Sequence, residues 1–496
     1  MPGTPLGVRP TFPPRRSLND LLAVAAGLRP DRPVAGATVT GCTLDSREVR
    51  PGDLYAALSG AQAHGADFAA AAVAAGATAI LTDPAGAGRC AAYDVPVLVD
   101  DDPRGVLGAV AAWVYGDPSA DLLVLGVTGT NGKTTTAFLL EAGLRAAGQA
   151  TGLLGTVVTR IGDQAVPSLR TTPEAPDLQA LFATMRERGV TAVAMEVSSH
   201  ALALGRVDGV RFDTSVFTNL SQDHLDFHPS MAAYEAAKAS LFTPARSRRG
   251  VVDIDDPAGQ RLFASASIPI TTYGERGQWR AAEVELRADG SSFRLVGPGV
   301  DVPASVRLPG AFNVSNAVAA LACLVVAGIP LADAVRGIAS LTGVPGRMER
   351  IDAGQPFTAI VDYAHTPEAV TTLLAAVRAL TAGRVVVVLG CGGDRDRGKR
   401  PLMGRAAVAG ADLAVLTSDN PRGENPLAIL AEMAAPGAVV EPDRRRAIEL
   451  AVRGARPGDV VVVAGKGHER GQEIAGTVTP FDDRQVLRET LLAVRA

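Results

Sequence analysis

The chain has 496 residues, which at roughly 150 residues per domain predicts about three domains. Hydrophobic residues make up 47% of it and charged residues 20%, so it can build large cores and is not a disordered protein. The net charge of −4 supplies no broad basic surface, which excludes a general nucleic-acid-binding protein. The four cysteines are widely spaced, which argues against a disulfide framework or a zinc site and favours a reducing cytoplasm.

Two segments of the sequence, one rich in proline and one apolar, indicate a protein that does not span a membrane. Residues 1–16 are rich in proline and lack an apolar stretch, so they are not a signal peptide, and we expect a disordered tail. The longest apolar run, Ala317 to Ala332, contains Gly328 and Pro330 and is too short to cross a bilayer. It predicts a helix in a protein core.

The chain order of apolar runs predicts an α/β protein with three domains. Residues 17–117 hold short strands between alanine-rich helices, and Gly116 to Pro118 suggests a boundary. Residues 118–344 predict a central domain of the P-loop type with a parallel sheet. Within it, residues 281–308 alternate in polarity and predict an antiparallel edge, and a helix is expected from about Asn316. Residues 345–496 repeat the strand–helix alternation and predict a doubly wound, Rossmann-like domain.

Lysine is scarce in this sequence. Of the 48 basic residues only Lys133, Lys238, Lys399 and Lys466 are lysines. A GC-rich codon bias would convert lysine to arginine wherever arginine suffices. Because the lysine amine is compact and can lose its proton, the four that remain are candidate site residues.

The strongest local signal lies at the start of the central domain. A buried strand, Leu122 to Val127, leads into a glycine turn, and Lys133 and Thr134 then open a helix. Backbone N–H groups at such a turn can cradle phosphates, the lysine can reach the β and γ oxygens, and a threonine hydroxyl can hold Mg²⁺. The strict G-x-x-x-x-G-K-T spacing is not met, because position 127 is valine.

Further polar clusters follow apolar strands, where ligands bind at the carboxyl edge of a parallel sheet. Glu196, in Met195 to His200, is a natural Mg²⁺ ligand. The stretch from Thr218 to Asp226 follows the next strand, and Lys238 lies on a helix beyond it. The C-terminal domain offers polar loops at Gly392 to Arg400, Asp419 to Arg422 and Gly465 to Glu469, which suggests one shared crevice. Cys391 has no histidine or asparagine partner pattern, which favours a packing role over a nucleophile.

Taken together and in order, these motifs resemble the Mur ligase family of peptidoglycan synthesis. The ordered set runs over residues 44–469 and comprises GTNGKTT, MEVSSH, TNL-x-x-DHLD, YEAAK, a helix-opening asparagine motif, GRME and the C-terminal loops. The DNPR sequence at 419–422 resembles the members that add 2,6-diaminopimelate. The resemblance implies three domains that bind a UDP-sugar, ATP and an amino acid.

The resemblance also implies roles for individual residues. It implies ATP binding by Gly129, Thr130, Asn131, Gly132, Lys133, Thr134, Thr135, Asn313, Asn316, Arg347 and Asp362. It implies contacts with the UDP-muramoyl substrate by Leu44, Ser46, Ala61, Gln62, Ala63, Thr171, Thr172, Ser198 and Arg206. It implies a diaminopimelate site of Arg395, Asp419, Asn420, Pro421, Arg422, Gly465 and Glu469. It implies catalytic residues Lys133, Glu196, His224 and Lys238, and a Mg²⁺ site of Thr134, Glu196, His224 and Lys238.

Two details of this resemblance concern side-chain chemistry. The lysine that matches Lys238 is carbamylated in the family, and this adduct turns a cation into an anion that can ligate Mg²⁺. Arginine cannot form it, and burial that depresses the lysine pKa would help, because the reaction needs a neutral amine. The family often has glutamine where this chain has Leu204, and asparagine where it has Arg170, which puts fine contacts with the muramoyl substrate in question.

The implied reaction is an ATP-dependent amide ligation. The γ-carboxylate of D-Glu in UDP-N-acetylmuramoyl-L-Ala-D-Glu would attack the γ-phosphoryl of ATP, and the amine of meso-diaminopimelate would then displace phosphate from the acyl phosphate. Arg422 is the natural bidentate partner of the distal carboxylate and Arg395 of the other, with Asn420, the Gly465 carbonyl and Glu469 receiving ammonium groups. A buried arginine should reject L-lysine by on the order of 100-fold. We expect a cytoplasmic monomer with a role in cell-wall biogenesis, cell shape and cell division.

Three alternatives stay open at this point. An L-lysine-adding Mur ligase would share all motifs except DNPR. A P-loop phosphotransferase or nucleotide switch would need neither Lys238 nor an amine-binding domain. A non-catalytic nucleotide-binding partner protein would be expected to lack Lys133 or Glu196, and both are present.

Overall fold

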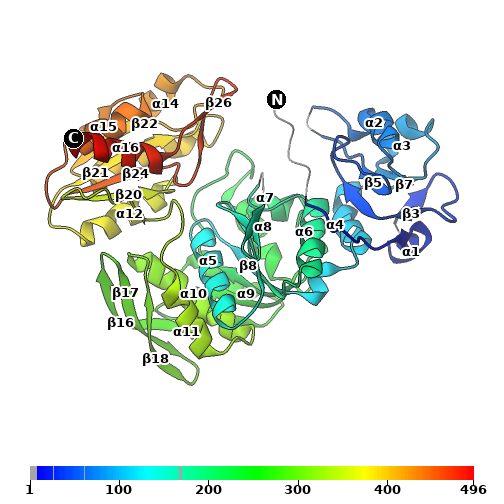
Figure 1. Ribbon diagram of the computed structural model, residues 1–496, viewed down its shortest axis with the longest axis horizontal. Coiled ribbons are helices and arrows are strands. Elements are labelled where there is room, and N and C mark those ends of the chain that lie inside the picture. Colours follow the sequence, from blue (N-terminus) through cyan, green and yellow to red (C-terminus); the bar gives the residue numbers. More distant parts are fainter. Residues whose placement is uncertain (1–7, 26, 61, 167–169, 496) are drawn as a thin grey trace.

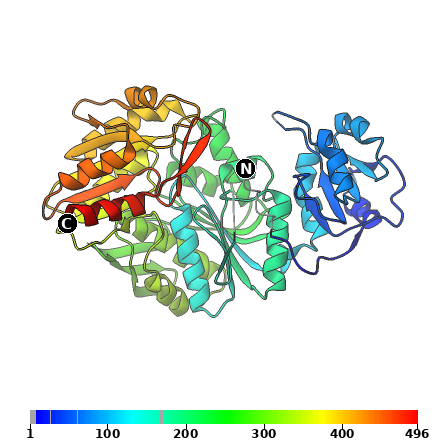
Figure 2. The same cartoon turned by 45° about the horizontal axis from the view of Figure 1, so that its top comes forward.

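The computed structural model describes residues 8–495 except 26, 61 and 167–169. Three α/β bodies lie in a row, with the N-terminal body at one end, the central body in the middle and the C-terminal body at the other end (Figures 1 and 2). Each body has its own sheet. The predicted mixed α/β class with parallel sheets is confirmed. Within the described residues no helix is both long and apolar enough to cross a membrane.

The N-terminal body is built on a five-stranded sheet in the order β2-β7-β6-β5-β4, parallel except for β2. Its strands are β2 (Arg29–Pro30), β4 (Gly41–Thr43), β5 (Asp53–Ala56), β6 (Ala79–Thr82) and β7 (Val97–Val99). A short strand pair, β1 (Arg16–Ser17) with β3 (Thr38–Val39), lies beside it. Its helices are α1 (Leu18–Val24), α2 (Ala69–Ala74), α3 (Pro84–Cys90) and α4 (Pro103–Val114). The loops after β4 and before α2 carry the residues expected to meet the UDP-sugar.

The expectation of a disordered tail over residues 1–16 is wrong for its described part. Residues 1–7 lie outside the described residues. The guanidinium of Arg9 is almost fully buried and donates hydrogen bonds to the carboxylate of Asp53 at 3.0 Å and to the hydroxyl of Tyr115 at 2.9 Å. The backbone N–H of Thr11 reaches Glu187 of the central body. A buried arginine that finds a carboxylate anchors this proline-rich segment.

The central body has an eight-stranded sheet in the order β11-β10-β9-β12-β8-β13-β14-β15. Six strands are parallel, and the β10–β11 hairpin is an antiparallel edge. The strands are β8 (Leu123–Thr128), β9 (Thr151–Leu154), β10 (Thr159–Ile161), β11 (Gln164–Val166), β12 (Ala192–Glu196), β13 (Phe212–Phe217), β14 (Ser247–Asp253) and β15 (Ile270–Tyr273). The helices are α5 (Lys133–Ala146), α6 (Ala175–Glu187), α7 (Ser199–Ala203), α8 (Met231–Ala239), α9 (Pro257–Ser265), α10 (Ala311–Val326) and α11 (Leu331–Ser340). One core lies between the sheet and α5 and α10, and a second lies between the sheet and α6 and α9.

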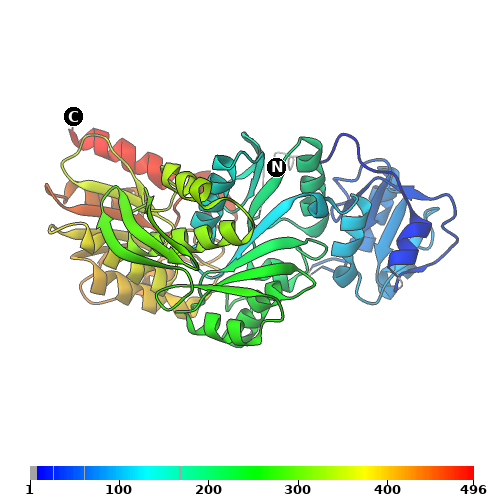
Figure 3. The same ribbon diagram turned by 90° about the horizontal axis from the view of Figure 1, so that it is seen from below.

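Two expectations for this region need correction. Residues 281–308 form a separate antiparallel sheet instead of an edge of the main one, with strands β16 (Arg280–Arg287), β17 (Gly290–Gly297) and β18 (Val300–Val306), seen beside α10 and α11 in Figure 3. Alternating polarity predicts antiparallel pairing but not the pairing partner. The long apolar run Ala317 to Ala332 is a core helix only as far as Val326, the end of α10, because the chain turns at Gly328, whose φ is +90°, and Pro330 precedes α11.

The C-terminal body has a six-stranded sheet in the order β19-β20-β24-β21-β22-β23, parallel from β20 onwards. Its strands are β19 (Glu349–Arg350), β20 (Thr358–Asp362), β21 (Val385–Cys391), β22 (Leu413–Ser418), β23 (Val439–Val440) and β24 (Val460–Ala464), with the hairpin β25 (Gly471–Ile474) and β26 (Thr477–Pro480) outside the sheet. Its helices are α12 (Pro367–Ala379), α13 (Arg400–Gly410), α14 (Pro426–Met433), α15 (Arg444–Arg453) and α16 (Asp483–Arg495). Two cores cover the two faces of this sheet, as a doubly wound fold requires.

Candidate active site

A large cavity of about 740 Å³ opens where the carboxyl ends of the central strands face the C-terminal body. It brings together many of the residues predicted as ATP, metal and muramoyl contacts. Of the predicted residues, those lining it are Thr130, Asn131, Gly132, Lys133, Thr134, Thr135, Thr171, Thr172, Glu196, Ser198, Arg206, His224, Lys238, Asn316, Arg347, Asp362 and Arg395.

The glycine turn that the sequence predicts to bind phosphate connects β8 to α5. Two glycines are required there: a Cβ on Gly129 would lie 1.9 Å from the hydroxyl of Thr218, and one on Gly132 would lie 2.5 Å from the Asn316 side chain. Both have positive φ, +147° and +86°. The Lys133 ammonium folds over the turn and donates to the carbonyl oxygens of Gly129 at 2.9 Å and Thr130 at 2.8 Å. The turn therefore presents N–H groups, a helix N-terminus and an ammonium to one space.

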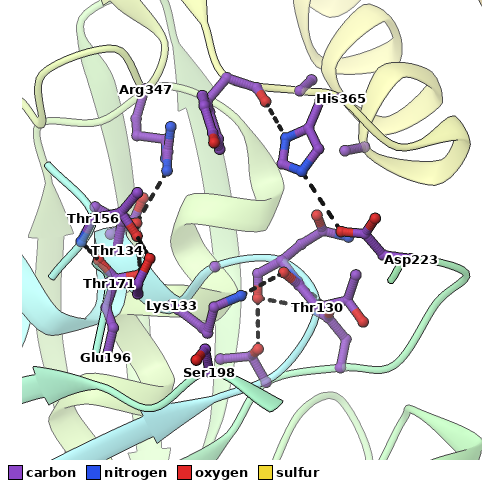
Figure 4. Close-up of a pocket in the computed structure, with 18 of the residues that line it drawn as sticks. Thr130, Lys133, Thr134, Thr156, Thr171, Glu196, Ser198, Asp223, Arg347 and His365 are labelled. Carbon is purple, nitrogen blue, oxygen red and sulfur yellow. Dashed lines mark hydrogen bonds and ion pairs between the residues drawn. The ribbon is translucent and has the colours of Figure 1, made fainter. Parts of the chain in front are cut away.

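Glu196 ends β12 inside the cavity and is almost fully buried. Its carboxylate accepts hydrogen bonds from the hydroxyl of Thr134 at 3.0 Å, and from both the backbone N–H and the hydroxyl of Thr156, at 2.7 and 3.1 Å (Figure 4). The Thr156 and Thr171 hydroxyls are 2.9 Å apart. A carboxylate beside a helix-opening threonine hydroxyl supplies the hard oxygen ligands that Mg²⁺ prefers.

Thr156 is a cavity residue that the sequence analysis does not identify. Thr156 lies two residues beyond Leu154, the last residue of β9, and β9 lies next to β12 in the sheet, so a polar residue just past the end of β9 falls beside Glu196. The sequence signal that could have identified Thr156 is its position just after an apolar strand, the same kind of signal that identified Glu196. The order of the strands in the sheet places Thr156 next to Glu196, and the sequence does not predict that order.

Lys238 of α8 is buried beneath this glycine turn, with its ammonium 2.8 Å from the Gly129 carbonyl oxygen and over the ring of Tyr234. Burial, with the nearby Lys133 ammonium, holds the pKa of Lys238 well below its ordinary value. Its amine is thus biased towards the neutral, nucleophilic form.

Asp223 joins the central and C-terminal bodies. Its buried carboxylate lies 3.4 Å from His224, 3.6 Å from His365 and 3.5 Å from Lys399, of which the last two belong to the C-terminal body (Figure 4 shows His365). Burial lowers the pKa of His224 to about 3, so its imidazole is neutral and available as a ligand. The sequence analysis placed Asp223 in a polar stretch and named Lys399 as a candidate site residue, without assigning either of them this contact.

Residues of the C-terminal body line one side of the cavity, among them Arg347 and Asp362, which the sequence predicts as ATP contacts. The guanidinium of Arg347 donates to the Thr134 hydroxyl at 3.0 Å and stacks over the Tyr363 ring. Asp362, at the end of β20, accepts from the N–H groups of Met348 and Ala364, each at 2.8 Å. The Asn316 amide donates to Asn313, which stands behind the cavity wall.

The predicted diaminopimelate residues form a second group next to this cavity. Arg395 lines the cavity, and Arg422 lies beside it, since a Cβ on Gly392 would be 2.8 Å from a guanidinium nitrogen of Arg422 and 3.8 Å from the Arg395 side chain. Arg422 donates to the Gly393 carbonyl oxygen at 2.8 Å. The other members, which do not line the cavity, are Asp419, Asn420, Pro421, Gly465 and Glu469.

The remaining predicted contacts are not brought to the cavity. Leu44, Ser46, Gln62 and Ala63 belong to loops of the N-terminal body, and Ala61 lies outside the described residues. Gly129 and Asn313 support the cavity without lining it. No group of three or more His, Cys, Asp and Glu side chains in the described part of the chain is arranged to hold a metal ion by itself.

Comparison with known proteins agrees with this geometry. Three family descriptions match the chain in order: "Mur ligase family, catalytic domain" over residues 38–115, "Mur ligase middle domain" over 127–324 and "Mur ligase, glutamate ligase domain" over 346–467. The chain belongs to the Mur ligase family. Among the Mur ligases it resembles is the UDP-N-acetylmuramoyl-L-alanyl-D-glutamate–2,6-diaminopimelate ligase of Streptomyces coelicolor, which is 56% identical over 99% of this chain and 98% of that protein.

Other Mur ligases extend the comparison. The same-named ligase of Corynebacterium glutamicum is 48% identical over 93% of each chain. A solved structure with this name has 35% identity and a TM-score of 0.66, covering 94% of this chain and 97% of that one. A MurF structure from Acinetobacter baumannii, at 21% identity, has a TM-score of 0.68 over 97% and 98% of the two chains and supports the fold alone.

Proposed function

We propose that this protein is the ATP-dependent, ADP-forming ligase that joins meso-2,6-diaminopimelate to the D-Glu γ-carboxylate of UDP-N-acetylmuramoyl-L-Ala-D-Glu, a step of peptidoglycan precursor synthesis. The observation that carries it is the 56% identity along 99% of the chain to a ligase of that name. The cavity supports it, because a phosphate-binding turn, the buried carboxylate of Glu196 and Arg395 of the C-terminal body border one space.

The chain's own residues do three things in this reaction. The turn from Gly129 to Thr134 and the Lys133 ammonium bind the phosphates of ATP and neutralise charge on the transferred phosphoryl group. Thr171, Thr172, Ser198 and Arg206 border the same cavity and hold the muramoyl dipeptide. The acceptor carboxylate is thereby placed in line with the γ-phosphorus, which is worth a large part of the rate enhancement.

The chemistry then proceeds in two displacements. The D-Glu γ-carboxylate forms a bond to the γ-phosphorus while the bond to ADP breaks. The diaminopimelate amine attacks the carbonyl carbon of the acyl phosphate, loses a proton and expels inorganic phosphate. The C-terminal body delivers this amine across the interface that Asp223 and Arg347 bridge.

The site also fits Mg²⁺. Thr134, Glu196, neutral His224 and a carbamylated Lys238 would hold it, and when bound it would neutralise charge on the phosphate oxygens. Carbamylation joins CO₂ to the neutral amine of Lys238 and releases a proton, and the low pKa of this buried lysine favours it. On the same grounds we propose a role in cell-wall biogenesis, and through it in cell shape and division, for a protein that works in the cytoplasm as a monomer.

The test measures the release of phosphate from ATP in the presence of Mg²⁺ and the UDP-muramoyl dipeptide. It is run once with meso-diaminopimelate and once with L-lysine. We expect release only with diaminopimelate. Release with lysine would break the specificity proposed for Arg422, and release without any amine would point to a phosphotransferase.

A further inference from the structure

Two of the four lysines have no part in the phosphate site, and one of them lies in the proposed amino-acid site. Lys466 follows β24 and has no exposed surface. Its ammonium donates to the Asn420 side-chain oxygen and to the Glu469 carboxylate, both at 2.9 Å. A buried ammonium is tolerated only when it is paired and hydrogen-bonded, so these contacts hold the loop together.

These contacts fix the orientation of the Asn420 amide. Its oxygen accepts from the Lys466 ammonium and also from the backbone N–H of Glu473 at 3.0 Å. Since both partners are donors, the oxygen and nitrogen of this amide cannot be exchanged. A carbonyl oxygen has two lone pairs, and both are used.

The Asn420 amide can therefore form a further hydrogen bond only as a donor. One N–H of its amide nitrogen goes to the Glu469 carboxylate at 2.8 Å, which leaves the second N–H. An N–H suits a substrate carboxylate and not an ammonium. This contradicts the expectation that Asn420 would receive an ammonium group of diaminopimelate, and leaves that task to the Glu469 carboxylate.

Lys466 also affects the ionisation of the neighbouring Asp419. Burial alone would raise the pKa of Asp419, but the ammonium of Lys466 and the guanidinium of Arg444 outweigh it, so the pKa falls below its ordinary value. Arg444 is itself enclosed, paired with Asp483 and bonded to the Ala464 carbonyl oxygen at the end of β24. Lys466 thus helps to keep the carboxylate of Asp419 ionised.

We infer that Lys466 is a positioning residue for the amino-acid substrate: it locks the Asn420 amide as a hydrogen-bond donor for a substrate carboxylate and orients Glu469 to receive a substrate ammonium. Arginine cannot replace it, because its planar fork needs more room than the enclosed ammonium occupies. This inference rests on the proposed function, since it assigns the parts of the amino-acid site of that reaction.

The test measures steady-state kinetics of the full chain with Lys466→Met. We expect the KM for meso-diaminopimelate to rise about ten- to hundredfold, because two bonds that orient its contacts are lost. We expect the KM for ATP to change little and the melting temperature to fall, because the buried partners of the Lys466 ammonium are left without it. Arg470→Met, which removes an exposed cation from the same loop, is the matched control and should behave as the wild type. An unchanged diaminopimelate KM, or parallel changes in both KM values, would overturn the inference.

A second variant remains informative if Lys466→Met fails to fold. Asn420→Asp keeps the oxygen that accepts from Lys466 and Glu473 but replaces the donor with a second oxygen. We expect the diaminopimelate KM to rise about tenfold or more. An ammonium-accepting role would instead leave it unchanged or lower it, which would refute the donor assignment. Wild-type turnover with diaminopimelate is measured first, because its absence would refute the proposed function and not the role of Lys466.

Discussion

The ammonium of Lys399, in the C-terminal body, lies 3.5 Å from the carboxylate of Asp223, which directly precedes His224 in the central body. The two residues are separated by 176 positions in the chain and both are buried. Nearby, the Gln222 amide donates to Asp396 at 3.0 Å. The loop that carries His224 is therefore docked on the body expected to deliver the amine.

Asp223→Asn should weaken this docking. The variant keeps the shape of the side chain but removes the charge that Lys399 and His365 face, so we expect kcat to fall on the order of tenfold to a hundredfold. Phosphate release with saturating substrates measures it. Asp226→Asn, an exposed carboxylate on the same loop, is the control and should keep wild-type kcat. Equal kcat in the two variants would show that docking through Asp223 does not matter.

Arg422→Ala tests recognition of the distal carboxylate. We expect the diaminopimelate KM to rise by on the order of 100-fold, because a bidentate charged partner is lost, with little change for ATP. The same variant should narrow the preference for diaminopimelate over L-lysine. Arg470→Ala serves as the exposed control. A diaminopimelate KM within twofold of the control would remove Arg422 from recognition, whatever the effect on kcat.

Lys238 gives a test of the carbamate. Lys238→Arg should lose on the order of 100-fold or more in activity, since a guanidinium forms no carbamate, and Lys238→Ala should regain part of its activity with added acetate or formate. Wild-type activity should also depend on dissolved CO₂. Full activity of the arginine variant, or no rescue of the alanine variant by any short carboxylate, would contradict the carbamate proposal.

Arg9 tests whether the anchored N-terminal segment supports the fold. Arg9→Met leaves Asp53 buried without its partner, which should cost about 3 kcal/mol of unfolding free energy. Denaturant unfolding followed by fluorescence measures it. Arg29→Met breaks the exposed Arg29–Asp101 pair and should cost less than about 1 kcal/mol. Similar losses in both variants would mean that the Arg9 contact adds nothing beyond a surface pair.

The contrast between Lys133 and Thr156 shows what the sequence could predict. The turn around Lys133 is a local pattern, in which an apolar strand, glycines and a helix start coincide within a few residues. The position of Thr156 beside Glu196 depends on β9 pairing with β12, some 40 residues apart in the chain. Spacing along a single chain carries no information on that order.

The same limit explains two of the wrong expectations about segments. The alternation of residues 281–308 predicts antiparallel strands correctly, but the strands pair among themselves. The proline content of residues 1–16 suggests disorder, while Arg9 finds a buried carboxylate 44 residues away. In both cases a contact remote in sequence decides the outcome, and composition describes only the segment itself.

Asp253, at the end of β14, gives a pH-dependent prediction. Burial, followed by repulsion from Asp255 and Asp256, raises its pKa to about 7, and its carboxylate accepts from the N–H of Asp255 at 2.9 Å. The folded state then binds more protons than the unfolded state between the ordinary pKa near 4 and about 7. The free energy of unfolding should therefore fall as pH rises through this window, and the deficit should be complete above pH 7.

Asp253→Asn should remove this deficit. The asparagine oxygen can still accept the Asp255 N–H, and the side chain carries no charge to bury, so we expect a gain on the order of 3–4 kcal/mol above pH 7 and little change near pH 4. Denaturant unfolding at a series of pH values measures it. Asp289→Asn, at an exposed aspartate, is the control and should shift stability by the same small amount at every pH. A gain for Asp253→Asn that is equal at pH 4 and pH 8 would mean that the effect is not the titration of this carboxyl.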